Sequence, residues 1–178
     1  MGVVREIFSL IREKAVVREA LDKTLTVAKV LCGLHVVNTY LGTVVLPYGP
    51  SMLPTISLTG NLLLAERVST RFGKVERGDV VLFRSPQQPR MVVTKRVIGM
   101  EGDTVKFVAD PKKSDRCETI VVPRGHVWVE GDNIYASKDS RKYGPVPYGL
   151  LEAKVFCRIW PPKEFGPLRQ TKVKDAES

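Results

Sequence analysis

A predominantly apolar stretch of 22 residues, Leu25 to Leu46, constrains this chain more than any other feature of its sequence. As an α-helix it would be about 33 Å long, which matches the roughly 30 Å hydrocarbon core of a bilayer. Lys29 lies near its start, where a long side chain can reach the interface, and the 17 residues from Val30 to Leu46 carry no fixed charge. A transmembrane helix over residues 25–46 is therefore the expectation, with a buried core helix and a secretory signal peptide as the alternatives.

Residues 1–24, before this stretch, form a charged amphipathic segment. Apolar side chains recur in it at the three- and four-residue steps of a helix: Val4, Ile7, Phe8 and Ile11. Its four acidic side chains argue against a cleavable transit peptide, which would be poor in acid. Five basic side chains leave a net charge of only +1, so the flanking charge does not predict the orientation of the span.

After Leu46 the pattern changes to short apolar runs separated by turn-forming residues such as Gly131–Asp132–Asn133. The runs cover residues 62–65, 80–83, 91–93, 104–108, 119–122, 126–129 and 150–160. Short strands at this spacing favour an antiparallel β-domain over βαβ units. We expect residues 47–166 to form one mainly β domain, and the polar residues 167–178 to form a flexible tail.

The part of the chain after residue 46 is basic, with 22 basic and 15 acidic side chains. A basic domain can face nucleic acid or the anionic surface of a membrane. The basic residues are spread across the expected strands, without a basic block interleaved with aromatic residues. This distribution is typical of solvated strand faces, so nucleic acid is not an expected partner.

The chain contains three cysteines, Cys32, Cys117 and Cys157, and two histidines. No two of the cysteines form a Cys-x-x-Cys pair, so neither a disulfide framework nor a zinc site is indicated. Free thiols are expected, although one Cys117–Cys157 bridge is compatible with the pattern. No metal and no cofactor are expected.

The segment Tyr48–Thr55, Y-G-P-S-M-L-P-T, places Ser51 between two prolines. Each proline fixes its own φ near −65° and disfavours the α conformation for the residue before it, here Gly49 and Leu53. We therefore expect a stiff, extended segment that presents the Ser51 hydroxyl at a set place. A serine between prolines is most often part of a simple turn, so this segment alone does not indicate catalysis.

A nucleophilic serine needs a base, and Lys95 is the best candidate in this sequence. If residues 91–99 form a strand, alternation puts Lys95 on one face with Met91, Val93 and Val97. A lysine among apolar neighbours loses its charge more readily and can act as a general base. The structural alternative is a lysine at a strand edge whose amine reaches water. His126 falls in an expected strand and is interpreted as structural.

A third segment, residues 131–147, is rich in small polar side chains: Asp132, Asn133, Ser137, Asp139, Ser140 and Arg141. An ordinary solvent-exposed loop explains this composition. A loop whose hydroxyls and Asp–Arg pair hold a neighbouring lysine explains it equally well.

Four segments taken together resemble the sequence boxes of type I signal peptidases in order and spacing. They are G-P-S-M-L-P-T (49–55), R-G-D-V-V (77–81), K-R-V-I-G-M-E-G-D (95–103) and G-D-N-I-Y-A-S-K-D-S-R-K-Y-G-P-V-P (131–147). Members of this family are membrane-anchored serine endopeptidases with a Ser–Lys dyad. The resemblance implies an antiparallel β-domain of the signal-peptidase type behind an N-terminal transmembrane helix.

The resemblance also implies roles for individual residues. Ser51 matches the family's nucleophile and Lys95 its general base. Ser137 matches a serine that hydrogen-bonds and orients the lysine. Asp139 and Arg141 match a buried ion pair that shapes the site.

Family substrates bind as an extended strand beside the nucleophile. We expect Met52, Val92 and Val93 to form walls of the substrate pocket. The backbone N–H of Ser51 matches one donor of the oxyanion hole. Gly49 stands where some family members carry a serine that completes this hole, so the sequence does not identify the second donor.

Within the family, residues 123–133, 143–150 and 159–169 resemble subunit 1 of the mitochondrial inner membrane protease. This resemblance implies a membrane enzyme whose catalytic domain faces the intermembrane space. It also implies that the enzyme cuts presequences from precursor proteins delivered there, together with a second catalytic subunit, subunit 2. Three alternatives are a signal peptidase of another compartment, a self-cleaving repressor domain, and a non-catalytic, membrane-tethered β-domain that binds peptides or anionic lipid. A repressor would need a DNA-binding domain, which residues 1–46 do not resemble.

Overall fold

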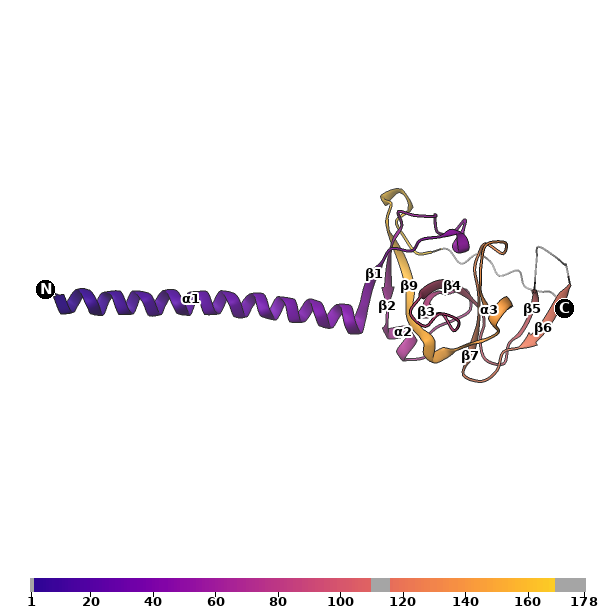
Figure 1. Cartoon of the computed structure of the whole chain (residues 1–178), viewed down its shortest axis with the longest axis horizontal. Helices are drawn as coiled ribbons and strands as arrows, with labels where there is room; N and C mark the ends of the chain where they lie inside the picture. Colours follow the sequence, from indigo (N-terminus) through magenta and orange to yellow (C-terminus); the bar gives the residue numbers. More distant parts are fainter. Residues whose placement is uncertain (1, 110–115, 169–178) are drawn as a thin grey trace. The chain divides into compact units, whose positions relative to one another are not determined.

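The fold is taken from a computed structural model that describes residues 2–109 and 116–168, without the side chains of residues 2–13 and 15 (Figure 1). The chain divides into two units, residues 1–40 and 41–178, which are described separately. Of the flexible tail expected over residues 167–178, residues 169–178 lie outside this description.

The first unit is one long helix, α1, over Gly2–Val36, followed by a π-helical turn over Val37–Leu41. The helix runs without a break through residue 24, where the charged segment meets the apolar one. Large apolar side chains are exposed along it: Val16, Val17, Leu21, Leu25, Val27, Val30, Leu31 and Leu34. Residues Val16–Leu41 are long and apolar enough to cross a membrane.

The last residues of the expected transmembrane helix are a strand, so the helix prediction was wrong for them. Gly42–Val45 form β1, which pairs antiparallel with β2 (Leu62–Glu66). Thr43, Val44 and Val45 are β-branched, and such residues favour a strand where a partner strand is available. Gly42 fits this pairing because a Cβ there would lie 2.9 Å from the carbonyl oxygen of Ala65.

The second unit is built on a seven-stranded sheet in the order β1-β2-β9-β3-β4-β7-β8. The remaining strands of this sheet are β3 (Val80–Arg84), β4 (Val92–Gly99), β7 (His126–Glu130), β8 (Val146–Pro147) and β9 (Leu151–Trp160). A separate two-stranded sheet contains β5 (Thr104–Val108) and β6 (Cys117–Val121). All of these pairings are antiparallel, which confirms the expected fold class. Cys117 and Cys157 lie in different sheets.

Short helical segments connect the strands. Two are α-helical, α2 (Val68–Arg71) and α3 (Ser140–Tyr143). Three are 3₁₀ turns: Pro50–Met52, Tyr148–Leu150 and Pro162–Glu164.

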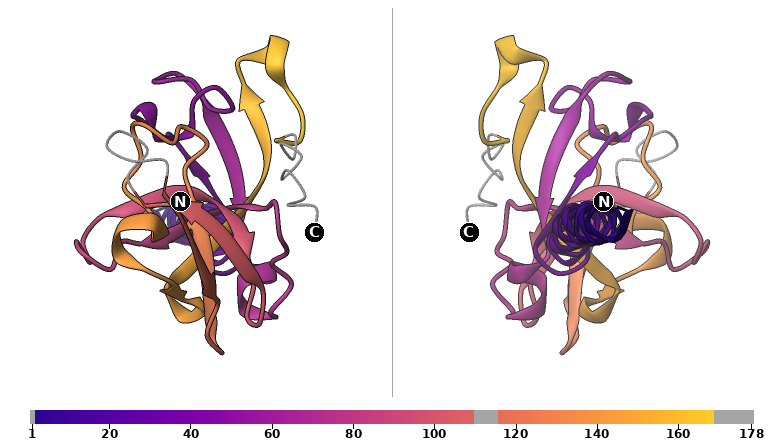
Figure 2. Two further views of the ribbon diagram at one scale, coloured as in Figure 1. Left: turned by 90° about the vertical axis from the view of Figure 1, so that its right-hand side faces the viewer. Right: turned by 90° about the vertical axis from the view of Figure 1, so that its left-hand side faces the viewer.

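The central strands are buried on both faces. Val80 and Leu82 of β3 belong to one hydrophobic cluster, and Val81 and Phe83 of the same strand belong to another. Figure 2 shows that the sheet is strongly twisted, so that β2 and β9 cross β4 at a steep angle. Consecutive residues of β4 are therefore also buried, and this places two cations inside the domain.

Candidate active site

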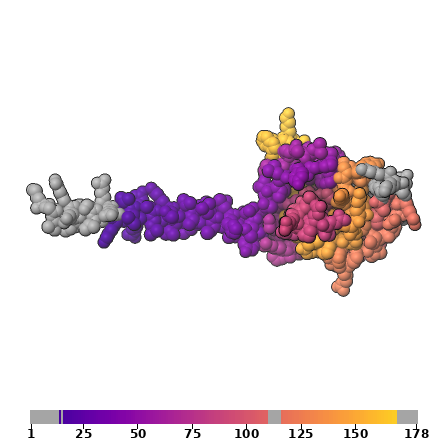
Figure 3. All heavy atoms as spheres, in the orientation of Figure 1, coloured from indigo at the N-terminus to yellow at the C-terminus, as the bar shows by residue number. Residues whose placement is uncertain are grey.

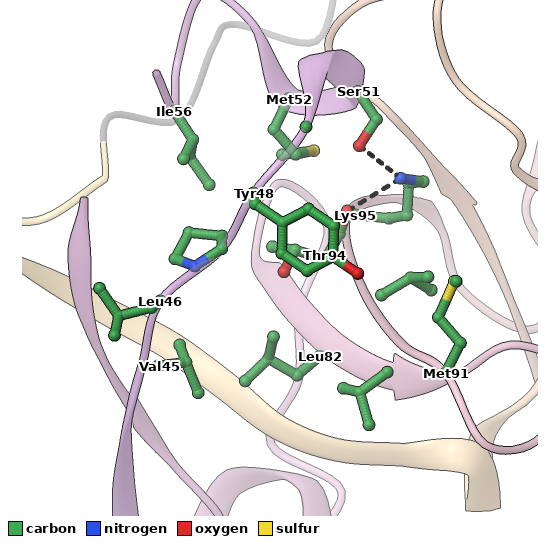
Figure 4. A pocket seen from close by; sticks show the side chains of 14 residues that line it. Val45, Leu46, Tyr48, Ser51, Met52, Ile56, Leu82, Met91, Thr94 and Lys95 are labelled. Carbon is green, nitrogen blue, oxygen red and sulfur yellow. Dashed lines mark hydrogen bonds between the residues drawn. The ribbon is translucent and has the colours of Figure 1, made fainter. Parts of the chain in front are cut away.

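Ser51 lies in the 3₁₀ turn Pro50–Met52, so the prediction of an extended segment was wrong at this point (Figure 4). Pro50 occupies the first position of the turn, where its fixed φ and missing N–H are compatible with helical geometry. The residues before the two prolines are non-helical, as expected. Leu53 is extended, and Gly49 has a φ of 104°, a conformation that glycine adopts with little strain.

The turn is held on two sides. Met52 and Ile56 are buried in the first hydrophobic cluster, and the Ile56 N–H donates to the carbonyl oxygen of Met52 at 2.8 Å. On the other side, the Asn133 N–H donates to the carbonyl oxygen of Ser51 at 3.1 Å. The backbone that carries the Ser51 hydroxyl is therefore fixed by the core and by the 131–139 loop.

Lys95 projects from β4 toward Ser51, across 44 residues of sequence. Its side chain is only 3% exposed. Its Nζ donates to Ser51 Oγ at 2.7 Å and to the carbonyl oxygen of Thr94 at 3.1 Å (Figure 4). A serine hydroxyl and a buried amine thus lie in direct contact.

Burial lowers the pKa of Lys95 from 10.5 to about 8, because the apolar surroundings disfavour the charged amine. Arg141 lowers this pKa further, whereas the carboxylates of Asp139 and Asp132 raise it. The neutral amine, the form that can accept a proton, is therefore available near physiological pH.

Asp139 and Arg141 form a buried ion pair beside this contact. Asp139 is fully buried and accepts from Arg141 Nε at 2.8 Å, Arg141 Nη2 at 2.5 Å and the Gly131 N–H at 2.9 Å. It also caps the N-terminus of α3 by accepting from the Arg141 N–H. Burial opposes its charge, but hydrogen bonds from Arg141, the Gly131 N–H and Ser137 outweigh burial and lower the pKa of Asp139.

Ser137 is buried next to these groups but does not make the hydrogen bond that the resemblance implies. Lys95 Nζ bonds to the Thr94 carbonyl oxygen instead. Within the described part of the chain, Ser137 Oγ has no hydrogen bond of ordinary geometry, although it lies near enough to Asp139 to lower the pKa of that carboxyl. It packs so closely on Gly131 that a Cβ there would lie 2.3 Å from Ser137 Oγ and 2.4 Å from the Ser51 carbonyl oxygen.

The sequence interpretation missed a second buried ion pair, between Arg96 and Asp132. Arg96 is 2% exposed and donates through Nε and Nη2 to the Asp132 carboxylate at 2.8 and 2.7 Å. Its Nη1 donates to the carbonyl oxygen of Gly78 at 2.8 Å. Arg96 follows Lys95 in β4, so strand alternation puts it on the opposite face, and the sequence interpretation did not consider that both faces of β4 are buried.

The sequence interpretation also missed a second group of residues, which holds the loop after Ser51. Arg158 on β9 donates to the carbonyl oxygen of Thr55 and pairs with Glu164. Arg96 Nη2 also approaches Thr55 Oγ1, at 3.5 Å. No local pattern in the sequence links these residues, because Arg158 lies 103 residues beyond Thr55.

The Ser51–Lys95 contact opens into a cavity of about 360 Å³ (Figure 4). Met52, Val92 and Val93 all line it, so the structure places the three expected wall residues at the site. The cavity is also lined by residues that the sequence interpretation did not assign to it: Val45, Leu46, Pro47, Tyr48, Ile56 and Leu82. The walls are largely apolar, which suits a small apolar peptide side chain.

The backbone of Gly49 is not available as the second oxyanion donor. Its N–H donates to the carbonyl oxygen of Leu58 at 3.0 Å, and glycine has no side chain to substitute for it. The second donor must therefore come from another group at the site.

Comparisons with known proteins identify the family of this chain. A family model described as signal peptidase, peptidase S26, matches residues 20–111 and 108–160. The mitochondrial ATP-independent inner membrane protease subunit 1b of Arabidopsis thaliana is 54% identical over 86% of this chain and 91% of its own length. The human mitochondrial inner membrane protease subunit 1 is 45% identical over 78% of this chain and 81% of its own. Subunit 2 of the Schizosaccharomyces pombe protease is 43% identical over 71% of this chain and 67% of its own. The chain therefore belongs to the peptidase S26 family of signal peptidases and is a serine protease of that type.

Proposed function

We propose that this protein is a membrane-anchored endopeptidase that uses Ser51 as nucleophile and Lys95 as general base. In this proposal it removes sorting presequences from proteins delivered to the mitochondrial intermembrane space. The observation that carries the catalytic assignment is the 2.7 Å contact between Lys95 Nζ, which is almost fully buried, and Ser51 Oγ. The location is supported by similarity to proteases whose names assign them to the mitochondrial inner membrane.

In the first half of the reaction, neutral Lys95 accepts the Ser51 hydroxyl proton while Oγ attacks the carbonyl carbon of the scissile peptide bond. The resulting oxyanion accepts a hydrogen bond from the Ser51 backbone N–H. When the intermediate collapses, the C–N bond breaks and Lys95 returns its proton to the leaving amine. The products are an ester on Ser51 and a free amino terminus.

In the second half, Lys95 accepts a proton from a water molecule, whose oxygen attacks the ester carbonyl carbon. Collapse of this intermediate breaks the bond to Ser51 Oγ, and Lys95 returns the proton to the serine. A pKa of about 8 suits both steps, because the amine must accept and release a proton near the working pH.

We assign positioning roles to Ser137, Asp139 and Arg141. Asp139 binds the Gly131 N–H, and two residues later the Asn133 N–H binds the Ser51 carbonyl oxygen. The Asp139–Arg141 pair thereby holds the loop that contacts the nucleophile. Ser137, in the same loop, packs closely against Gly131. Met52, Val92 and Val93 would contact an extended substrate in the cavity.

We further propose that residues Val16–Leu41 cross the inner membrane, with the β-domain on the side of the intermembrane space. The partners would be precursor proteins and a second catalytic subunit. Proteins that are similar to this chain include both subunit 1 and subunit 2 of such proteases, which supports a complex of two related subunits.

Cleavage of a presequence-bearing precursor by membranes that contain the protein and subunit 2 tests the catalytic assignment. Ser51→Ala and Lys95→Ala should each leave the precursor uncut at normal protein abundance. Ser57→Ala, at an exposed serine six residues further along, should cut at the wild-type rate. If Ser51→Ala or Lys95→Ala cuts at the wild-type rate, the assignment is wrong, and a peptide-binding domain becomes the better interpretation.

A further inference from the structure

A second hollow, the outer hollow, adjoins the cavity beside Ser51. It has a volume of about 710 Å³ and is lined by Tyr48, Gln88, Pro89, Arg90, Met91 and Val92. Tyr48, Met91 and Val92 also line the catalytic cavity, so the two spaces meet along these side chains. A peptide that leaves the catalytic cavity on this side therefore passes over the outer hollow.

The loop between β3 and β4 forms most of the outer hollow, and its own backbone hydrogen bonds hold it in shape. The Ser85 N–H donates to the carbonyl oxygen of Met91 at 2.9 Å, and the Met91 N–H donates to the carbonyl oxygen of Gln88 at 2.8 Å. Figure 3 shows residues 84–92, in pink, at the outer surface of the β-domain. The loop thus presents Arg90 at a defined place on the surface.

The outer hollow combines apolar walls with one cation. Tyr48 is 83% exposed, so a bound peptide would cover an aromatic ring that water now contacts. Arg90 is exposed, and no hydrogen bond or ion pair within residues 2–109 and 116–168 engages its guanidinium. None of the described residues that line the hollow is an aspartate or a glutamate. A side chain with an apolar stem and a carboxylate end fits these features, because a guanidinium binds carboxylates through paired N–H groups.

The proposed mechanism indicates which half of the substrate lies in the two spaces. After the first step, the part of the substrate before the cut stays esterified to Ser51, while the amine part departs and water takes its place. A walled cavity suits the half that stays. Residues before the cut therefore occupy the catalytic cavity, and residues further before the cut reach the outer hollow.

The spacing along the strand gives the position in the substrate. Lys95 lies four positions after Met91. An extended peptide beside this strand advances by the same roughly 3.3 Å per residue, so it reaches Met91 about four residues from the scissile bond. Arg90, one position before Met91, is therefore next to about the fourth or fifth residue before the cut.

We propose that the outer hollow binds an acidic side chain of the presequence, about four or five residues before the cut, and that Arg90 pairs with its carboxylate. The proposal rests on the proposed protease function and names a feature of its substrates. A substrate is favoured over a subunit contact as the occupant, because the hollow adjoins the catalytic cavity and shares three of its lining side chains.

Cleavage of a precursor series by membranes that contain the protein and subunit 2 tests this pairing. Each precursor carries glutamate, glutamine or lysine at one position, from six residues before to three residues after the cut, and is otherwise unchanged and free of acidic residues in that window. Cleavage that persists with Ser51→Ala is subtracted. We expect kcat/KM to be about fivefold higher for glutamate than for glutamine, only near the fourth or fifth residue before the cut, and lower still for lysine. High salt should reduce this preference, because the pair is exposed.

A charge reversal separates pairing from a structural role of the loop. Arg90→Glu should reverse the preference, so that the lysine precursor is cut about fivefold faster than the glutamate precursor. Arg124→Glu makes the same change at an exposed arginine that lines neither cavity, and it should keep the wild-type preference. Damage to the loop would lower the cleavage of all precursors alike and would not reverse their order.

Equal kcat/KM for the three precursors, or an Arg90→Glu enzyme that still prefers glutamate, would overturn the proposal. A charge preference found only after the cut would also overturn it. Equal losses for all precursors, together with loss of subunit 2 from the complex, would overturn it in favour of a subunit contact. In each case the protease assignment stands as long as Ser51→Ala abolishes cleavage. If Ser51→Ala cuts every precursor at the wild-type rate, the proposed function itself fails.

Discussion

Helix α1 and strand β4 both depart from the usual distribution of side chains in soluble proteins, in opposite directions. The helix exposes large apolar side chains such as Leu25, Leu31 and Leu34. The strand buries two cations, Lys95 and Arg96, in the interior of the β-domain. Exposing apolar side chains to water and burying charges both cost free energy, so each arrangement requires a further interaction or a change of charge that offsets the cost.

The helix and the strand differ in what offsets this free-energy cost, and that difference matters for function. An exposed leucine costs about 1.5–3 kcal/mol relative to burial, and a bilayer would recover this free energy for the helix. Arg96 is compensated within the protein, because it contacts the Asp132 carboxylate. Lys95 contacts only neutral oxygens, a hydroxyl and a carbonyl, in its two hydrogen bonds. Its pKa therefore falls, and the amine becomes a base.

The largest expected effect is from Lys95→Arg, which keeps the charge and removes the base. A guanidinium cannot be deprotonated, so we expect kcat/KM to fall by at least about 10³-fold. Lys154→Arg is the matched control, because Lys154 also lies in a strand but pairs with Asp79. It should keep wild-type activity. Precursor cleavage at equal protein abundance measures both, and an active Lys95→Arg enzyme would exclude Lys95 as the base.

The next largest effect concerns the buried ion pair. Asp139→Asn leaves the Arg141 charge buried without its carboxylate, so the free energy of unfolding should fall by about 3–5 kcal/mol. Glu152→Gln breaks the more exposed pair with Arg84 and should cost less than about 1 kcal/mol. Urea unfolding of the β-domain in detergent compares the two. Equal losses would mean that the buried pair has no special structural importance.

A charge in the helix should have an effect of about 3 kcal/mol, on membrane insertion rather than on folding. Leu31→Arg replaces an apolar residue near the middle of the candidate span by a cation. The fraction of protein that resists alkaline extraction from membranes should fall. Val121→Arg, at an exposed position of β6, should leave this fraction unchanged. Normal extraction resistance of Leu31→Arg would indicate that the helix does not cross the bilayer.

The smallest effect is the dependence of activity on pH. Only deprotonated Lys95 accepts the serine proton, and its pKa is lowered from 10.5 to about 8. Below about pH 8, kcat/KM should therefore fall about tenfold for each pH unit, and it should level off above that value. A profile that rises only toward pH 10.5 would show that burial does not lower this pKa during catalysis.

Much of the fold was predictable because it depends on local pattern. The apolar stretch predicted the helix, and each apolar run between residues 62 and 160 corresponds to a strand. The helix end was not predictable, because residues 42–45 become a strand only by pairing with β2. The 3₁₀ turn at Ser51 was missed because proline is compatible with the first position of a turn as well as with an extended chain.

The candidate site was predictable mainly through resemblance to a family. The structure brings Ser51 and Lys95 into contact and buries the Asp139–Arg141 pair, while their catalytic and positioning roles stay predictions. The Arg96–Asp132 pair was missed because alternation along one strand does not reveal whether both of its faces are covered. That depends on the twist of the whole sheet.

The sequence by itself determined the order of the strands along the chain, the apolar helix, and the serine, lysine and acidic residues available for chemistry. These features depend on residue type and on spacing within a few residues. Only the tertiary structure decided where the helix ends, which cations are buried and how strongly the pKa of Lys95 is lowered. Each of these depends on contacts between residues far apart in sequence, because the environment of a side chain is set by the neighbours that folding brings to it.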